Sequence, residues 1–255
     1  ADRKALDKTV NEYMKALRDT ADPSGVIRKS GSVIAYLGIP QTKAAFPSDI
    51  AARLDSIAVG ATTSPVENKS DNTLNVIKLI SKTELPDSVQ FRAIQVGGAT
   101  ADETVKRADS IYTALQAGAD FEAVAKKYGQ TGEKVWIASA QYQNAPSMDN
   151  DTRNYIHTLN TLGVNETKNI KLAQGNIILQ VTDRRAMTSK YVAAVIKKPI
   201  EFSKDTYSAA YNNFSRFVSE NQTLEAMQKN ASKYGYTVRE RADVRNSEHY
   251  VAGVS

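Results

Sequence analysis

The sequence predicts an α+β protein in which one strand–helix–helix unit occurs twice. The stretch FEAVAKKYG at 121–129 returns about a hundred residues later as LEAMQKNASKYG at 224–235. Each stretch follows a longer helical pattern, and that pattern follows a short run rich in β-branched and apolar residues. A period of this length is the size of a small domain, so it indicates related domains and not a solenoid.

The first copy begins with a predicted strand at 90–96, followed by two glycines that would end it. Thr100 and Glu103 form a capping box at the start of a segment whose apolar residues have helical spacing. Asp120 is placed to cap a second, shorter helix. The second copy has the same order, with a predicted strand at 190–198 and Ser203 as the cap of the longer helix. Thr223 is the expected cap of its shorter helix.

A second pattern of turn, extended stretch and alternating strand occurs at 59–80 and again at 163–183. Each occurrence precedes a short polar segment, SKTELPDS (81–88) or RRAMTS (184–189), which we interpret as a link. Together the two patterns predict three parts, with one boundary near Pro86. They are a divergent back half (1–85), a whole unit (86–185) and a C-terminal strand–helix–helix unit (186–255).

Composition excludes several classes of function. The 255 residues carry a net charge of +5, but the basic side chains are scattered, so no nucleic-acid partner is predicted. There is no cysteine, no phosphate-binding loop and no metal-ligand spacing, and the two histidines, His157 and His249, are far apart in sequence. No cofactor or metal is therefore predicted.

The chain has no apolar run of membrane-spanning length, so no membrane contact is expected from these residues. It also has no signal-peptide pattern and no initiator methionine. We therefore expect it to be a piece of a longer protein, with any targeting segment upstream.

Twelve tyrosines supply apolar rings with polar tips, which suit contact surfaces. The helical spacing of Tyr207, Tyr211 and Tyr234 nevertheless predicts core positions for these three. Tyr250 lies near the C-terminus and is not assigned. The sole tryptophan, Trp136, is expected to pack within a strand and not to bind a ligand.

With this order established, residues 89–183 resemble a parvulin-type peptidyl-prolyl isomerase domain, also called a rotamase or PpiC domain. The resemblance implies an FKBP-like antiparallel sheet with helices, flanked by partial units of the same kind. The stretches that carry it, in order, are VQFRAIQV (89–96), ADSIYTALQAGADFEAVAKKYG (108–129), GEKVWI (132–137), LGVNETKNIKL (162–172) and GNIILQVTDRR (175–185).

Residues from 190 onward are similar to the region that follows this domain in PpiD- and SurA-like periplasmic folding factors. The tandem degenerate units favour the PpiD-like branch found in Bacteroidetes. This resemblance implies a periplasmic chaperone for unfolded secreted polypeptides, held at the inner membrane by an N-terminal segment outside the sequence given.

The resemblance also implies where catalytic groups would lie. The two histidine positions of the family fall on Ala93 and Ile177, so both histidines are absent. The loop that would carry a Cys or Asp is shortened to GQT at 129–131. His157 matches neither histidine position, and we expect it on a surface helix or loop.

The apolar socket for the proline ring falls near Tyr142 and Pro146, with Met148 as a substitute. The predicted substrate-binding residues are therefore Ala93, Tyr142, Met148 and Ile177, and no catalytic residue is assigned. Everything depends on Ala93 and Ile177 being neighbours at the base of one groove.

Three functions remain open. The first is a folding factor that binds unfolded or proline-containing polypeptides with little or no isomerase activity, a pseudoenzyme. The second is an active isomerase that uses other polar groups, for example Tyr142 or Gln180. The third is a structural scaffold that positions a neighbouring domain. The two half units can pair with each other, with upstream residues, or with another copy by strand exchange.

Overall fold

The computed structural model describes residues 2–239, which fall into two compact units. Residues 3–200 form the larger unit, and the described part of the second consists of residue 2 and residues 201–239. Helices and antiparallel strands occur together, so the predicted α+β class is confirmed. The elements of the larger unit, in chain order, are α1 (Asp2–Asp19), α2 (Ser24–Ser30), η1 (Lys43–Ala45), α3 (Ser48–Ala51), η2 (Leu54–Ser56), β1 (Val66–Asn68), β2 (Thr73–Val96), α4 (Ala101–Gln116), α5 (Phe121–Lys127), β3 (Val135–Ala138), η3 (Ser139–Gln141), α6 (Asn150–Thr161), β4 (Thr167–Leu172) and β5 (Gly175–Pro199).

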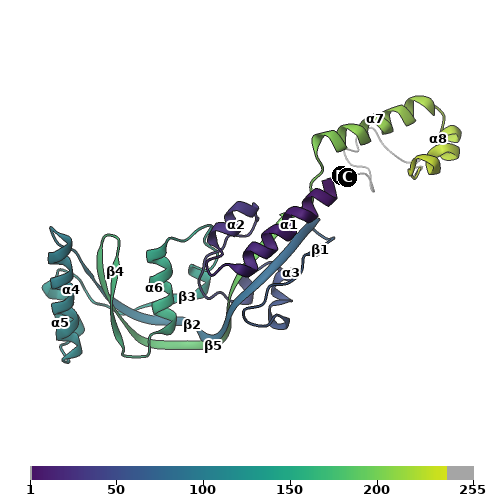
Figure 1. The fold of residues 1–255 in the computed structure, drawn as a ribbon. Coiled ribbons are helices and arrows are strands. Elements are labelled where there is room, and N and C mark those ends of the chain that lie inside the picture. The colour runs from purple at the N-terminus through teal and green to yellow at the C-terminus, as the bar shows by residue number, and fades with distance from the viewer. Residues whose placement is uncertain (1, 240–255) are drawn as a thin grey trace, which may run out of the picture. The chain divides into compact units, whose positions relative to one another are not determined.

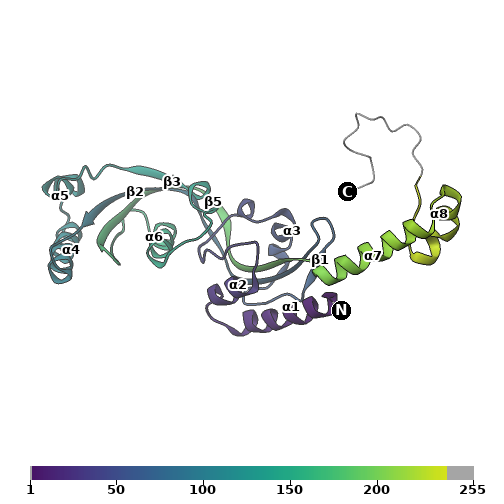
Figure 2. The same cartoon turned by 90° about the horizontal axis from the view of Figure 1, so that it is seen from above.

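Two long antiparallel strands, β2 and β5, run through the whole of this unit (Figure 1). They pair from Thr73 opposite Pro199 to Val96 opposite Asn176. The sheet order is β1-β2-β5-β4, and β3 pairs with the other side of β2. Figures 1 and 2 show α4 and α5 at one end of the two strands and α1, α2 and α3 around the other.

The two polar segments interpreted as links are strands, so that interpretation is wrong. Residues 82–86 of β2 pair directly with residues 187–191 of β5. Lys82, Thr83 and Glu84 are exposed in this ribbon, so their polar sequence resembles that of a loop. Pro86 is compatible with a strand where its missing N–H needs no partner. The boundaries placed near 85 and 185 consequently fall inside continuous strands, and the division into compact units comes at residue 200.

The predicted repeat is present in the ladders, with an offset of 103 residues. Ala93 lies opposite Leu179, and the positions 103 residues away, Ile196 and Val76, also lie opposite each other. The same shift relates the β4–β5 ladder to the β1–β2 ladder, in which Val66 pairs with Asn75. The two predicted half units therefore pair with each other within one chain and build a second, divergent copy of the sheet.

The local predictions for the first copy are confirmed. The side chain of Thr100 accepts a hydrogen bond from the backbone N–H of Glu103 and caps α4. Asp120 caps α5 in the same way. Apolar residues of α4 and α5 then pack on one face of the sheet, against Ile94 and Ile178. The other face is covered by α6.

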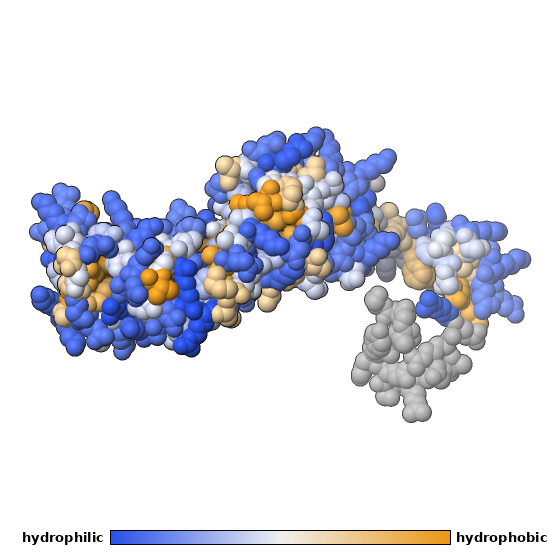
Figure 3. Space-filling view, turned by 90° about the horizontal axis from the view of Figure 1, so that it is seen from below, coloured by the Kyte–Doolittle hydropathy of each residue, from blue (hydrophilic) through white to orange (hydrophobic). Residues whose placement is uncertain are grey.

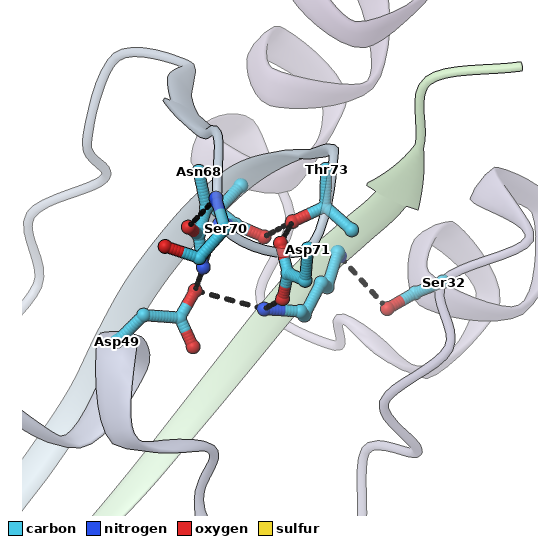
Figure 4. A network of polar contacts seen from close by, with 8 residues as sticks. Ser32, Asp49, Asn68, Ser70, Asp71 and Thr73 are labelled. Carbon is cyan, nitrogen blue, oxygen red and sulfur yellow. Dashed lines mark hydrogen bonds and ion pairs between the residues drawn. The ribbon is translucent and has the colours of Figure 1, made fainter. Parts of the chain in front are cut away.

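A polar network around a buried lysine connects parts of the second copy, and Figure 4 labels its members Asp49, Asn68 and Asp71. Lys197 on β5 has a side chain only 7% exposed, and its Nζ lies 2.8 Å from a carboxylate oxygen of Asp49 and 2.5 Å from one of Asp71. Asp49 also accepts hydrogen bonds from Asn68 and Asn75. The network thus connects α3, the β1–β2 turn and β5.

The second unit, as far as residue 239, is made of three helical elements. Ser203 and Thr223 cap its two longer helices, as predicted. The core positions predicted for Tyr207 and Tyr211 are wrong, because both side chains are exposed, whereas Tyr234 is 40% exposed and packs with one side against Phe217. Helical spacing marks a common face, but it does not say what covers that face. His249 and Tyr250 lie outside the described residues. The elements of this unit are α7 (Lys204–Glu220), α8 (Leu224–Asn230) and η4 (Ala231–Tyr234).

Candidate functional site

The candidate site is the face of β2 and β5 that lies beneath α6. Ala93 is opposite Leu179 and Ile177 is opposite Gln95 in the ladder, so Ala93 and Ile177 are diagonal neighbours on adjacent strands. Both belong to one apolar cluster, in which Ile177 is buried and Ala93 is half-buried. The predicted juxtaposition of these two positions is therefore present.

All four predicted substrate-binding residues belong to this cluster, because Tyr142 and Met148 pack against its buried members. They do not meet at one point, however. The Tyr142 hydroxyl lies 3.4 Å from the Ser139 hydroxyl, which donates to the backbone carbonyl of Asp87. Asp87 precedes Ala93 by six residues along β2, which is roughly 20 Å at the usual strand rise. Tyr142 thus lies near the opposite end of the cluster from Ala93.

The Tyr142 hydroxyl is engaged by a buried lysine. Lys190 on β5 is 1% exposed, and its Nζ donates to the Tyr142 hydroxyl at 3.2 Å and to the side-chain carbonyl of Asn160 at 2.7 Å. Within the described residues it makes no ion pair with a carboxylate. No local pattern predicts this contact, because Lys190 is the first residue of the predicted strand at 190–198 and directly follows the segment interpreted as a link.

Gln180, the other polar residue considered for an active site, lies on the opposite face of the sheet. It is next to Leu179 in β5, and side chains alternate along a strand. Its side-chain oxygen accepts a hydrogen bond from the Nε of Arg92 at 2.8 Å, and the Arg92 guanidinium lies over the Phe121 ring of α5. Gln180 therefore cannot serve a ligand held between Ala93 and α6.

The shortened GQT loop (129–131) has a structural role at the edge of the apolar floor, the sheet face that carries Ala93 and Ile177. The side-chain amide of Gln130 donates to the backbone carbonyl of Gln95 at 2.7 Å and accepts from its N–H at 2.8 Å. Gln95 is the residue opposite Ile177. The loop that would carry an ionisable group in the family thus satisfies backbone groups of β2 here.

Tyr155 on α6 packs edge-on against the ring of Phe91, with 6.0 Å between the two ring centroids. Burial raises the pKa of Tyr155 to about 12. His157 lies on an exposed position of the same helix, as expected. The cluster consists of apolar and aromatic side chains, among them two tyrosines. The site can therefore pack apolar groups and donate a hydrogen bond from a neutral phenol.

We expect the Tyr155→Phe variant to lose one phenol that ionises near pH 12, seen as a difference in ultraviolet absorbance during alkaline titration. The remaining tyrosines occur in both proteins and cancel in the difference. Because the folded pKa lies above the ordinary value of about 10, the folded state holds this proton more tightly between those two pH values, and stability falls as pH rises through that interval. A lost phenol that ionises near pH 10 would contradict this burial.

Two segments outside the predicted site complete the cluster. Leu37 and Ile39, from the loop between α2 and η1, are 2% and 0% exposed within it. The Nε of Arg153 on α6 donates to the backbone carbonyl of Leu37 at 2.6 Å and holds that loop in place. Leu37 and Arg153 are far apart in sequence, so no local pattern predicts that this loop joins the cluster.

An antiparallel sheet with two helices on one face and one on the other defines a class of small α+β domain. Residues 74–185 match the family model described as the PPIC-type PPIASE domain. These residues match the parvulin-type rotamases, as the resemblance predicted, and proline-containing peptides are the coarse class of partner that this domain implies. Comparison with curated proteins and with solved structures gave no match.

No helix between residues 2 and 239 combines the length and apolar character needed to cross a membrane. The same part of the chain contains no group of three potential metal-ligating side chains.

Proposed function

We propose that this protein is a folding factor of the peptidyl-prolyl isomerase family that binds unfolded, proline-containing polypeptides with little or no isomerase activity. The observation that supports it most directly is the apolar floor, where Ala93 and Ile177 occupy the two positions at which the resemblance places histidines. The proposed location is the periplasm, with an upstream segment as membrane anchor. Cell fractionation of the full-length protein tests the location.

The chemistry of isomerisation explains why the floor matters. An X–Pro amide must rotate over a barrier of about 18–20 kcal/mol, which takes tens to hundreds of seconds without help. A catalyst has to stabilise the twisted amide more than the planar one, and polar groups aimed at the reacting bond do this. Side chains of alanine and isoleucine can hold the proline ring but cannot favour the twisted amide electrostatically.

The loss of both histidines is easily tolerated. An apolar pair in a buried cluster leaves no donor or acceptor without a partner, so the fold is kept. The two hydrogen bonds of the Gln130 side chain likewise satisfy the backbone N–H and carbonyl of Gln95. The proposed contact for apolar and proline-containing segments is the half-buried Ala93 together with its apolar neighbours.

The expected result of a proline-peptide isomerisation assay is a rate within about twofold of the uncatalysed rate, even at micromolar protein. The Ala93→His/Ile177→His variant, checked for folding by circular dichroism, should be faster than wild type, because it restores polar groups at the floor. An Ala93→Asn/Ile177→Asn variant controls for polarity alone. A wild-type acceleration of tenfold or more that is lost in Tyr155→Phe would sink the proposal in favour of an active isomerase.

A further inference from the structure

The long helix of the second unit carries an apolar stripe that the described residues leave open. Tyr207, Tyr211, Phe214 and Val218 are 70%, 59%, 50% and 37% exposed, and their spacing puts them on one face of α7. Figure 3 shows apolar surface, in orange and tan, on the part of the molecule that contains α7 and α8. Exposed apolar patches of a few hundred Å² are often functional in soluble proteins.

The internal repeat identifies what kind of surface this stripe is. The caps of α4 and α7, Thr100 and Ser203, are 103 residues apart, the same offset that relates the two sheet ladders. Shifted by this offset, the four stripe positions fall on the face of α4 that is turned toward the sheet. In chain order these equivalent residues are Thr104, Ala108, Ile111 and Leu115.

On α4 this face covers an apolar sheet surface formed by Ile94, Val96 and Ile178. The same offset leads to Lys197, Pro199 and Asn75 in the second copy of the sheet. There Lys197 and Asn75 bind Asp49 in the polar network, so these positions offer no apolar surface. The stripe on α7 therefore resembles the face of α4 that packs on strands. In the second copy of the sheet, however, two of the three positions that would receive such a face are polar.

The small core of the second unit lies on a neighbouring face of α7. Phe217 is buried against Tyr234 and Tyr236, with ring centroids 5.3 and 5.0 Å away. Phe214 reaches the edge of this group through its contact with Tyr236 and is still half exposed. Within the described residues, the core is thus completed without Tyr207 and Tyr211.

The size and charge of the stripe distinguish between two kinds of partner, a second copy of this chain and an apolar peptide segment. Fully buried aromatic side chains contribute about 150–250 Å² each, so the exposed parts of the stripe amount to roughly 300–500 Å². This is less than the roughly 800 Å² per partner of a stable interface, which disfavours a permanent dimer of this chain. Lys204, Asp205, Arg216 and Glu220 give α7 no net charge, so the stripe complements an uncharged apolar segment.

We propose that the Tyr207–Val218 stripe of α7 binds extended, uncharged apolar segments of unfolded polypeptides, independently of proline. This rests on the proposed folding-factor function and assigns it a second surface, separate from the Ala93–Ile177 floor. Tyrosine and phenylalanine supply large contact area with few rotatable bonds, and the tyrosine hydroxyls bond to the backbone of a bound chain.

The test uses the full chain and a fluorescein-labelled twelve-residue peptide that alternates Leu, Val and Phe with Ser and Thr and has no proline. We expect the Tyr207→Ala/Tyr211→Ala/Phe214→Ala variant to bind it at least tenfold more weakly than wild type, measured by fluorescence anisotropy. The matched control, Ser208→Ala/Asn212→Ala/Ser215→Ala, changes exposed polar positions of the same helix and should stay within twofold. Circular dichroism verifies that both variants keep their helix content.

Several outcomes would overturn the inference. Equal binding by wild type and the aromatic variant would place the peptide elsewhere. Dimerisation of wild type that the aromatic variant loses, seen by analytical ultracentrifugation, would make a second copy the occupant. A lower unfolding midpoint of the larger unit in that variant would mean that the stripe packs within the chain. Isomerase turnover by wild type would instead overturn the proposed function and leave the peptide result standing.

Discussion

Replacing Lys197 with Met should lower the free energy of unfolding by about 2 kcal/mol, because it leaves the partly buried carboxylate of Asp49 without its charged hydrogen-bond partner. The Nζ of Lys197 holds carboxylates from α3 and from the β1–β2 turn, at 2.8 Å from Asp49 and 2.5 Å from Asp71. Methionine has nearly the same length, so the packing of the aliphatic part changes little. Urea unfolding followed by circular dichroism measures the loss.

The control is Lys168→Met, an exposed lysine on β4 that makes no ion pair within the described residues. Its free energy of unfolding should change by less than about 0.5 kcal/mol. Equal stability of the Lys197 variant and this control would show that the network contributes nothing measurable.

Acid should weaken the same network. Burial raises the pKa of Asp49, but hydrogen bonds from Lys197 and Asn68 lower it further, and the net direction is down. The hydrogen bond from Lys197 also lowers the pKa of Asp71. For a carboxyl group with a depressed folded pKa, the stabilisation is present above the unfolded pKa of about 4 and is lost as pH falls through the folded value. Stability of the wild type should therefore fall below about pH 4, and the Lys197→Met variant should lose less over that range.

Local features of this fold could be predicted because their causes are local. Thr100, Asp120, Ser203 and Thr223 were all identified as caps, and each accepts the expected backbone hydrogen bond. A cap needs only a side-chain oxygen three residues before an unsatisfied N–H, so the sequence contains all the information.

Features that depend on distant pairing could not be predicted in the same way. The ribbon formed by 82–86 and 187–191 has a polar sequence, and only the partner strand distinguishes it from a loop. The exposed stripe of α7 shows the same limit, since Tyr207 and Tyr211 have the spacing of a core face but lack a covering surface among the described residues. Periodicity predicts which residues share a face; burial depends on what meets that face.

The candidate site was predictable where it lies on strands and not where it depends on other segments. Ala93 and Ile177 could be assigned from the sequence, because each lies in a short strand motif of the family in which side chains alternate regularly. Lys190 beneath Tyr142, and the loop carrying Leu37 and Ile39, come from segments far away in sequence. These contacts make the floor part of a core that extends beyond the matched residues 74–185.

The Ile39→Ala variant tests this shared core and should lose about 3 kcal/mol of unfolding free energy, within the range found for buried large-to-alanine changes. Ile39 is 0% exposed in the cluster that contains Leu179 and Leu159, although it lies outside the family match. Val33→Ala, at a side chain 62% exposed in the same loop region, is the matched control and should change little. Because both sides of the cluster unfold together, tyrosine fluorescence and circular dichroism should report one transition at the same urea concentration. An unchanged midpoint for Ile39→Ala, or two separate transitions in wild type, would mean that the parvulin-type domain is stable without the N-terminal segment.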